Sequence, residues 1–472
     1  MQDGEATAAR FGGGEVAVVG LARSGSAAAR LAAREGAQVY ASDAGPRRAA
    51  ELAAAGAPDP LAVLGVDVQY GGHDLERIAK AALVIVSPGV PPDAPPIIAA
   101  RNAGVQVISE VELALWFLPK TRIIAVTGTN GKTTVTALIA HLLRSLGTEA
   151  VAAGNIGQAL SEIALLPRAP SWISLEMSSF QLHDTFSLRP AAGVLTNLSP
   201  DHLDRYASLD DYYADKDRIF ANADASSVWV TNADDVEVLR RTARVKGTHN
   251  RFSVNGLQVE AAFDTLHEQI TLFDSPLMPR ADIPLIGDHN VANVLAAVLA
   301  VASADRAFSA GSARERLAGG VRTFRPLPNR LEPVAEADGV VWINDSKATN
   351  VASARVAIEG MTRRVVVLLG GKHKGESYAS LGPAIAARAR CVLAYGEAAG
   401  RIASDLAGHT GNVAVEHLGS SFDEVISRAR TVAERGDAVL LSPACSSFDM
   451  FSNYEERGES FRRLAGAKGG AA

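Results

Sequence analysis

Short apolar runs alternate with helix-like segments along almost the whole chain. The runs are rich in β-branched residues and are bounded by turn residues, which is typical of buried strands. The stretches between them have helical spacing of apolar residues, clearest over 135–143 and 289–301. We expect strands at 16–20, 38–42, 83–87, 123–126, 172–175, 193–196, 228–231, 340–343, 365–369, 392–394 and 439–441. The alternation predicts α/β layers with mainly parallel sheets.

The predicted elements fall into three blocks, which we expect to be domains: 1–110, 111–325 and 326–472. The first and third blocks have the strand–helix alternation of Rossmann-like units. The second contains a glycine-rich turn between a strand and a helix, so we expect a central α/β domain of the P-loop ATPase type. The predicted fold class is therefore α/β with three domains.

Composition and charge narrow the functional classes. A chain of 472 residues exceeds what one core supports, and its 47% hydrophobic and 21% charged residues are ordinary for a globular protein. The net charge of -6 argues against nucleic acid as the main partner. No apolar run has membrane-spanning length, and the N-terminus lacks signal-peptide features. Two distant cysteines, Cys391 and Cys445, suggest a reducing cytoplasm.

The most informative segment is 123–134, Ile-Ile-Ala-Val-Thr-Gly-Thr-Asn-Gly-Lys-Thr-Thr. Its glycines let backbone N–H groups turn toward an anion, and the helix that follows adds its positive end. Lys132 can reach the β- and γ-phosphates of a nucleotide, and the Thr133 hydroxyl can bind Mg²⁺. Val126 stands where the usual pattern has its first glycine, so the loop is a variant. The alternative is an ordinary strand–turn–helix corner.

Acidic residues follow two further strands of the second block. Glu176 comes at the end of the strand at 172–175, where an acid downstream of a phosphate loop is a natural Mg²⁺ ligand. Asp201, His202 and Asp204 come after the next strand. The two aspartates can cap a helix, and His202 taken alone is better explained as structural, because Mg²⁺ prefers oxygen ligands.

Lys216 lies among Asp211, Asp215 and Asp217. Spacing alone favours a solvated helix face with salt bridges for this group. His289 and Asn293 are four residues apart on one helix face. That pair can point at a nucleotide or can serve as caps and internal hydrogen-bonding groups.

Polar loops follow three strands of the third block, at 344–350, 370–375 and 442–449. Parallel α/β sheets place their sites at such strand ends, so we expect a binding surface there. Cys445 has no basic neighbour in the sequence and is not expected to be a nucleophile. In the first block, the turn at 20–25 and Asp43 are similar to a Rossmann start, although plain tight turns explain them equally well.

Taken together, these segments resemble the Mur ligase family, and within it the members that add D-glutamate. The resemblance rests on motifs in order along the second and third blocks, and the first block matches more loosely. The motifs are TGTNGKTT at 127–134, GNIG at 154–157, EMSSFQL at 176–182, NLSPDHLDRY at 197–206, YADK at 213–216, HNVAN at 289–293, NRLE at 329–332, NDSKATN at 344–350 and SPACSS at 442–447.

The resemblance implies an ATP-dependent ligase of peptidoglycan precursor synthesis, and hence of cell-wall growth, cell shape and division. Such an enzyme joins D-glutamate to UDP-N-acetylmuramoyl-L-alanine through an acyl phosphate, in the cytoplasm. Its three domains bind the UDP-sugar, ATP and the incoming amino acid. ATP and two Mg²⁺ ions are the expected cofactors, small molecules the expected partners, and a monomer the expected state.

The resemblance also assigns roles to residues. It revises the interpretations of His202 and Lys216, which would both support a second Mg²⁺. Lys216 would do so as an N-carboxylated side chain. The implied catalytic residues are Lys132, Glu176, His202 and Lys216. The implied metal ligands are Thr133, Glu176, His202 and Lys216. The implied ATP contacts are Gly128, Thr129, Asn130, Gly131, Lys132, Thr133, Thr134, Asn293, Arg330 and Asp345. The implied amino-acid contacts are Lys347, Thr349, Lys374, Ser447 and Phe448. The expected UDP-sugar contacts are Ser24, Gly25, Asp43, Ser87, Gly89 and Asn155.

Three positions depart from the family pattern: Asn329 for a common histidine, Tyr454 for a common phenylalanine and Ala22 for a frequent glycine. Nearby alternatives are a related ligase that adds L-glutamate and a folylpolyglutamate-type ligase. A Rossmann oxidoreductase would rest on the first block alone, and the phosphate loop argues against it. A non-catalytic nucleotide-binding module would not need Lys132, Glu176 and Lys216 together.

Overall fold

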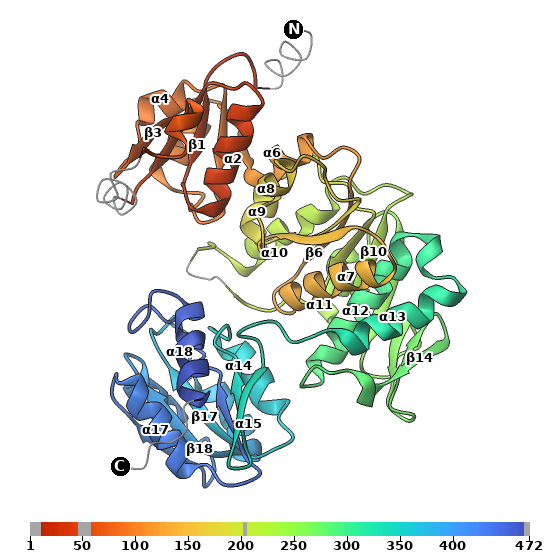
Figure 1. Cartoon of the computed structure of the whole chain (residues 1–472), viewed down its shortest axis with the longest axis vertical. Helices are drawn as coiled ribbons and strands as arrows, with labels where there is room; N and C mark the ends of the chain where they lie inside the picture. Colours follow the sequence, from red (N-terminus) through yellow and green to blue (C-terminus); the bar gives the residue numbers. More distant parts are fainter. Residues whose placement is uncertain (1–10, 46–57, 202–204, 467–472) are drawn as a thin grey trace. The chain divides into compact units, whose positions relative to one another are not determined.

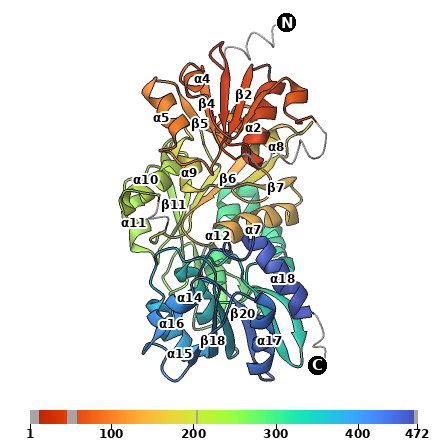
Figure 2. The same ribbon diagram turned by 90° about the vertical axis from the view of Figure 1, so that its left-hand side faces the viewer.

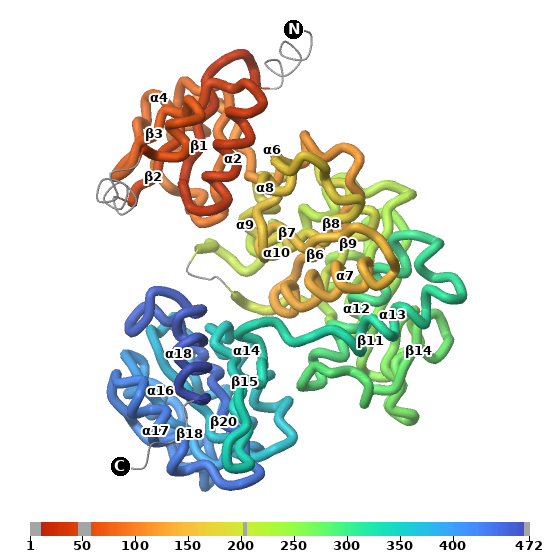
Figure 3. Tube along the Cα trace, viewed as in Figure 1, coloured from red at the N-terminus to blue at the C-terminus, as the bar shows by residue number. Residues whose placement is uncertain are grey.

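The computed structural model describes residues 11–45, 58–201 and 205–466. Three separate sheets follow one another along the chain, as the colours of Figures 1 and 3 show. The described residues up to Arg280, together with Asn293–Val321, form one compact unit that holds the first two sheets. Ala281–Ala292 and the described residues from Arg322 onward form a second unit with the third sheet.

The first sheet is five-stranded and parallel, in the order β3-β2-β1-β4-β5. This order reverses direction between β1 and β4, which creates a crevice at the carboxyl ends of these two strands. Its elements are β1 (Val16–Val19), α2 (Arg23–Arg34), β2 (Val39–Asp43), η1 (Ala62–Leu64), β3 (Asp67–Tyr70), α4 (Leu75–Ala79), β4 (Leu83–Val86), α5 (Pro95–Asn102), β5 (Val107–Ser109) and α6 (Glu110–Trp116).

The second sheet has nine strands in the order β14-β13-β12-β11-β10-β9-β6-β8-β7. Strands β7 to β11 and β6 pair in parallel, while β12, β13 and β14 form an antiparallel edge. The strands are β6 (Arg122–Thr127), β7 (Ala150–Gly154), β8 (Trp172–Glu176), β9 (Ala192–Leu195), β10 (Val228–Asn232), β11 (Thr248–Ser253), β12 (Ala261–Asp264), β13 (Gln269–Leu272) and β14 (Ser275–Pro279).

Helices follow most strands of this second sheet. They are α7 (Lys132–Ser145), α8 (Leu160–Ala164), α9 (Ser179–His183), α10 (Leu209–Asp217), η2 (Arg218–Phe220), α11 (Val236–Thr242), η3 (Arg280–Asp282), α12 (His289–Ala304), η4 (Arg306–Phe308) and α13 (Gly311–Thr323). Serines and aspartates cap several of them, including Ser178 before α9 and Ser208 before α10.

The third sheet has the order β15-β16-β20-β17-β18-β19, and β15 is its one antiparallel strand among the described residues. Its elements are β15 (Glu332–Ala337), β16 (Val340–Asn344), α14 (Val351–Glu359), β17 (Val365–Gly370), η5 (Ala379–Leu381), α15 (Gly382–Arg388), β18 (Ala389–Tyr395), α16 (Ala399–Leu406), β19 (Ala414–His417), α17 (Phe422–Val432), β20 (Ala438–Leu441) and α18 (Tyr454–Gly466).

Strand alternation divides the core of the second unit in two. Side chains on one face of the sheet pack against α14, α15 and α16, and those on the other face pack against α17 and α18. Figure 2 shows these two groups of helices on opposite sides of the sheet. Sheets covered on both faces explain the near-continuous apolar runs of the sequence.

The expected α/β class and the mainly parallel sheets are confirmed, with each expected strand present to within a few residues. The hairpin edge β12–β14 was not expected, because its strands are short, half polar and interrupted by Pro276 and Pro279. No helix in the described part of the chain is long and apolar enough to cross a bilayer.

Candidate active site

The phosphate loop connects β6 to α7 and requires glycine at two positions. Gly128 has φ +138° and Gly131 has φ +80°. A β-carbon at Gly128 would lie 2.1 Å from Thr196 Oγ1, and one at Gly131 would lie 2.3 Å from Asn293 Oδ1. Both positions therefore exclude a side chain by backbone conformation and by space. The expected Asn293 lies against this loop.

Lys132 is the first residue of α7, and its ammonium lies over the loop. Its Nζ donates to the carbonyl oxygens of Gly128 at 3.0 Å and Thr129 at 2.6 Å. Thr133 and Thr134 are buried in the first turn of α7. The cation, the helix N-terminus and the turned backbone together make a site suited to a polyphosphate.

The segment after β9 fixes the loop from one side. Asn197 O accepts from Thr129 N at 2.8 Å, and Asn197 Oδ1 accepts from Asn130 N at 2.9 Å. Asn197 Nδ2 donates back to Asn130 O at 3.1 Å. Ser199 N donates to Thr129 Oγ1 at 3.0 Å. The loop is thus held by backbone and side-chain bonds that a spacing pattern does not reveal.

Glu176 is the last residue of β8 and is 1% exposed. Its Oε1 accepts from Asn155 Nδ2 at 2.9 Å. Its Oε2 is buried and has no hydrogen-bond partner among the residues that the structure describes. A buried carboxylate oxygen of this kind is costly unless a cation or donor satisfies it, so Glu176 fits the expected role of a metal ligand.

Lys216 is also buried, with 1% of its surface exposed. Its Nζ donates to Gly128 O at 2.7 Å and lies 4.6 Å from the centre of the Tyr212 ring. Burial lowers the pKa of Lys216 well below its ordinary value, and the charge of Lys132 adds to the effect. The solvated, salt-bridged face that spacing favoured for Lys216 is wrong, because α10 packs this face against the phosphate loop.

The three aspartates near Lys216 have partners away from the phosphate loop. Asp215 accepts from Tyr206 Oη at 3.0 Å and lies 2.8 Å from His183 Nδ1. Asp217 pairs with Arg241 at 2.6 Å. Asp211 accepts from the Ser208 hydroxyl at 2.7 Å. These contacts hold α10 in place on sides other than the one that faces the phosphate loop.

His202 and Asp204, singled out above, lie outside the described residues. Within the described part, no three His, Cys, Asp or Glu side chains gather in a way that could hold a metal ion. Of the other implied ligands, Glu176 and Lys216 both lie beside the phosphate loop, with Thr133 in the first turn of α7.

Two candidate UDP-sugar residues are tied into the first turn of the first sheet. Asp43 Oδ2 accepts from Leu21 N at 2.6 Å, and its Oδ1 accepts from Gly45 N at 2.8 Å. A β-carbon at Gly25 would lie 1.7 Å from Gly20 O, so α2 can approach β1 only with glycine there. These contacts give both residues a structural role at the rim of the crevice.

A cavity of about 360 Å³ lies beside the end of β4 within the first unit. Among the candidates, Ser87 lines it. Residues from the α9 and α10 region also line it, namely Phe180, His183, Asp184, Tyr206 and Asp215. Sequence reasoning did not assign these five residues to a site. Phe180, Tyr206 and Asp215 lie within the motifs EMSSFQL, NLSPDHLDRY and YADK, but segments so far apart in the chain give no local sign that they line one cavity.

In the second unit, the three polar loops follow β16, β20 and β17, which are neighbours in the sheet. Because these three strands pair in parallel, their carboxyl ends and the loops that follow them lie at the same edge of the sheet. Lys374 Nζ donates to Thr349 Oγ1 at 3.4 Å, and Lys347 Nζ lies 5.2 Å from the centre of the Tyr454 ring. Ser447 is buried and Phe448 is 69% exposed.

Asp345 lies at the base of this edge. It accepts from the Ser442 hydroxyl at 2.8 Å and from Leu331 N at 3.2 Å. Burial raises the pKa of Asp345 to about 7, and the charge of Arg330 opposes this rise. In the neighbouring loop, burial raises the pKa of the Cys445 thiol to about 11, which agrees with the expectation that it is not a nucleophile.

Arg457 of α18 is a further residue that sequence reasoning missed. Its side chain is fully buried and donates to backbone carbonyls of the three loops: Ser346 O at 2.8 Å, Cys445 O at 3.2 Å and Gly370 O at 3.5 Å. Its Nε also donates to Ser346 Oγ at 2.9 Å. In the sequence it is one of several charged residues in a polar helix, and nothing marks it as buried.

Comparison with known families and proteins places these features in context. Residues 14–109 match the Mur ligase MurD-like N-terminal domain, residues 126–301 the Mur ligase middle domain and residues 329–445 the Mur ligase glutamate ligase domain. Among solved structures, UDP-N-acetylmuramate-alanine ligase MurC from Thermotoga maritima has a TM-score of 0.59 at 20% identity, covering 95% of this chain and 98% of that one. MurF from Acinetobacter baumannii has a TM-score of 0.58 at 16% identity, covering 82% and 85%. These two show a shared fold.

Closer similarity comes from curated relatives named UDP-N-acetylmuramoylalanine--D-glutamate ligase. The chain is 43% identical to the one from Acidobacterium capsulatum, over 98% of both chains. It is 42% identical to the one from Chromobacterium violaceum, over 94% of this chain and 96% of that one. On these matches and on the phosphate loop, Glu176 and Lys216, this chain belongs to the Mur ligase family.

Proposed function

We propose that this chain uses ATP to join D-glutamate to UDP-N-acetylmuramoyl-L-alanine. The observation that carries the proposal is the meeting of Lys132 and Lys216 at one carbonyl, that of Gly128, in a glycine-dependent phosphate loop. The names of relatives at about 40% identity over nearly the full chain support the choice of substrates.

The first step makes the alanine carboxylate reactive. A carboxylate is a poor acyl donor, so its oxygen attacks the γ-phosphorus of ATP, giving an acyl phosphate and ADP. The loop N–H groups and Lys132 would spread the charge of the transferring phosphoryl group. The glutamate amine then attacks the acyl carbon, loses a proton, and inorganic phosphate leaves as the amide forms.

Magnesium ions would bind at Thr133 and Glu176, and at Lys216 and His202 for a second ion. The buried, unsatisfied Glu176 Oε2 supports the first site within the described residues. When bound, Mg²⁺ neutralises phosphate charge during the transfer. The protein's part is to hold Glu176 through Asn155 and to exclude water around it.

Lys216 would serve as an N-carboxylated side chain. An ammonium cannot bind a metal, but the depressed pKa favours a neutral amine, which is the form that attacks CO₂. The nitrogen forms a bond to carbon, one proton is released, and the lysine becomes a carbamate with two oxygen donors. Burial beside the loop would protect this carbamate from bulk water.

The incoming glutamate would bind at the three strand ends of the second unit. Lys347 and Lys374 are point charges suited to its two carboxylates, and Thr349 and Ser447 are hydroxyl donors. Phe448, which is exposed, would cover the bound amino acid. Arg330 and Asp345 would contact the nucleotide, and Ser24, Gly25, Asp43, Ser87, Gly89 and Asn155 the UDP-sugar.

These assignments give each segment the main site for one substrate: the UDP-sugar for 1–110, ATP for 111–325 and the amino acid for 326–472. Asn155 would add a UDP-sugar contact from the second segment, and Arg330 and Asp345 would add nucleotide contacts from the third. We propose a monomer that acts in the cytoplasm on small molecules and binds no nucleic acid. The two cysteines, both buried free thiols, agree with a reducing compartment.

Phosphate release from ATP tests the proposal directly. The assay contains UDP-N-acetylmuramoyl-L-alanine, Mg²⁺ and either D-glutamate or L-glutamate, with product analysis for a new amide. We expect release and product with D-glutamate alone. Release with L-glutamate alone would keep the family and overturn the specificity, and no release with either would favour a folylpolyglutamate-type or non-catalytic role.

A further inference from the structure

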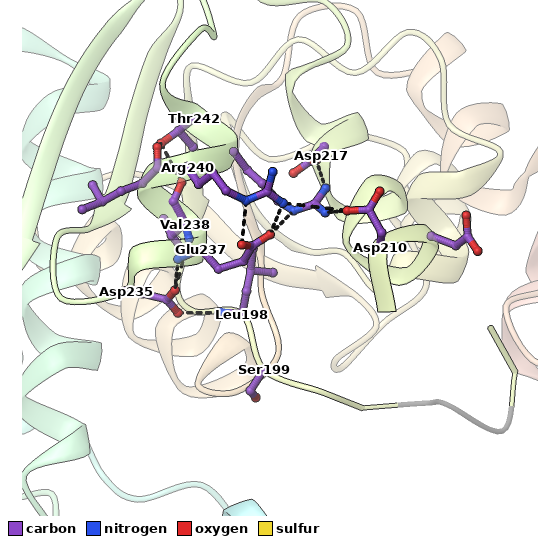
Figure 4. A network of polar contacts seen from close by, with 12 residues as sticks. Leu198, Ser199, Asp210, Asp217, Asp235, Glu237, Val238, Arg240 and Thr242 are labelled. Atoms are coloured by element: carbon purple, nitrogen blue, oxygen red, sulfur yellow. Dashed lines mark hydrogen bonds and ion pairs between the residues drawn. The ribbon is translucent and has the colours of Figure 1, made fainter. Parts of the chain in front are cut away.

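Helix α11 is linked to two segments, the one that follows β9 and helix α10, as Figure 4 shows for Leu198, Asp210 and Asp217. The residue before the helix, Asp235, uses both carboxylate oxygens. Its Oδ1 caps the helix by accepting from Glu237 N at 3.0 Å and Val238 N at 3.1 Å. Its Oδ2 accepts from Leu198 N at 2.8 Å. One carboxylate therefore ties the start of α11 to the segment after β9.

That segment is the one that holds the phosphate loop. Leu198 is flanked by Asn197, which brackets Asn130 and Thr129 with three hydrogen bonds, and by Ser199, which bonds Thr129. Leu198 itself is buried. Residues 197–199 thus hold the phosphate loop through the residues at their two ends, Asn197 and Ser199. The hydrogen bond from Leu198 N to Asp235 holds the middle residue of this segment in place.

The other end of α11 contacts the second segment, α10. The Arg241 side chain is 7% exposed and pairs with Asp217 at 2.6 Å and with Asp210. It also lies 5.0 Å from the centre of the Tyr213 ring. All three partners belong to α10, whose neighbouring face carries Lys216 to Gly128. Arg241 therefore fixes the helix that delivers Lys216.

We propose that α11 is a brace for the nucleotide site, in which Asp235 and Arg241 position the phosphate loop and Lys216 without touching the substrate. Both residues act through others, so they are positioning residues. The effect expected on turnover rests on the proposed function, because it requires the ligase reaction. The effect expected on nucleotide binding does not, because Kd for Mg²⁺–ADP is measured without any reaction.

The first test replaces Asp235 by serine. Serine still caps a helix, but its single short oxygen cannot also reach Leu198 N. We expect Asp235→Ser to raise KM for ATP and Kd for Mg²⁺–ADP about tenfold, as for loss of a hydrogen bond to a charged group. KM for D-glutamate should stay the same. Calorimetric titration with Mg²⁺–ADP gives Kd independently of any reaction.

Asp74→Ser is the matched control, because Asp74 caps α4 by accepting from Arg77 N at 3.0 Å in the first sheet's domain. It should leave both KM values and Kd unchanged. A merely structural effect of Asp235→Ser would reduce the folded fraction, lowering apparent kcat without changing Kd. Unchanged Kd for Mg²⁺–ADP in Asp235→Ser would overturn the proposal. If Asp235→Ser binds nucleotide more weakly but the parent protein has no ligase activity, the brace stands and only the proposed function is overturned.

The second test concerns the other end of α11, where Arg241 is replaced by methionine and, as the conservative variant, by lysine. We expect the methionine variant to lose most turnover and the lysine variant to recover part of it, because lysine keeps the charge but not the forked geometry. Arg240→Met is the control, since the Arg240 side chain is exposed, pairs with Glu237 at 2.6 Å and reaches α10 only at 3.8 Å from the exposed Asp210. If Arg241→Met matches Arg240→Met and the parent protein in kcat and in Kd, α11 is no brace at this end.

Discussion

At the residue scale, the phosphate loop depends on positions that carry no side chain. The motif alone predicted Gly128 and Gly131, because glycine-rich turns before a helix are a local signal. The structure adds the reason for each: Thr196 Oγ1 occupies the space beside one and Asn293 Oδ1 the space beside the other. These contacts come from residues about 70 and 160 positions away, beyond the reach of a local pattern.

Gly128→Ala should abolish nucleotide binding. The new methyl group would collide with Thr196 in a left-handed backbone region, so the loop must move. We expect at least a hundredfold weaker Kd for Mg²⁺–ADP by calorimetry, with about 1–3 kcal/mol of lost stability from backbone strain. The control is Gly65→Ala, at φ +81° with no atom near the added carbon. It should lose some stability and bind nucleotide normally; equal binding by both variants would contradict this account.

Glu110 makes stability depend on pH. This residue of α6 is 1% exposed, accepts from Ser161 N, and its Oε2 has no hydrogen-bond partner in the described part of the chain. Burial raises its pKa to about 7 from an ordinary 4.5, so the folded chain binds this proton more tightly. Its contribution to stability is full below pH 4.5 and is lost as pH rises through 7. The ionised form then costs roughly 3 kcal/mol.

Glu110→Gln should therefore be more stable than the parent chain at pH 8.5, with the advantage disappearing toward pH 5. Thermal unfolding midpoints across this range measure the difference. Glu112→Gln is the control: Glu112 Oε2 accepts from two backbone N–H groups, of Phe186 and Ser187, so its amide should destabilise. A Glu110→Gln advantage that does not vary with pH would refute the argument.

At the element scale, α18 organises the three polar loops of the second unit. Through Arg457 it joins three loops that follow three different strands, and Ser346 Oγ donates to Tyr454 O at 2.8 Å at the same place. The sequence predicted a polar loop after each of these three strands. It could not predict the arginine between them, because burial of a charge depends on which carbonyls surround it.

Arg457→Met should loosen the three loops together. We expect KM for D-glutamate to rise about 10- to 100-fold, as when hydrogen bonds to a charged group are lost, with KM for ATP nearly unchanged. Arg457→Lys should recover part of the loss. Arg430 also donates to backbone carbonyls of α18, at Leu464 and Ala465 away from the loops, so Arg430→Met is the control. Equal KM values for Arg457→Met and Arg430→Met would show that α18 does not set the loops.

At the scale of the whole molecule, the proposed sites belong to two compact units. The phosphate loop, Glu176 and Lys216 lie in the first, and the three polar loops lie in the second. The first unit holds two sheets and the second holds one, and each unit has buried core residues of its own, so each ligand should stabilise the segments that it contacts.

Hydrogen exchange measured by mass spectrometry should separate these effects. Mg²⁺–ADP at about a hundred times its Kd should slow exchange by up to about a hundredfold in 127–134 and 196–199. D-glutamate with the product nucleotide present should add protection in 346–350, 370–375 and 445–448. Added protection by glutamate inside 111–201 alone would contradict the assignment of the amino acid to the second unit.

The sequence by itself determined the order of strands and helices, the α/β class, the phosphate loop and the strand ends that carry polar loops. These follow from periodicity, glycine position and motif spacing, which are local properties of the chain. Tertiary structure decided which polar residues are buried. Lys216 was predicted from spacing to lie on a solvated face and is enclosed against Gly128, while Asp235 and Arg457 carried no signal. Their positions depend on partners brought together only when distant segments pack, because burial and hydrogen bonding are set by three-dimensional neighbours.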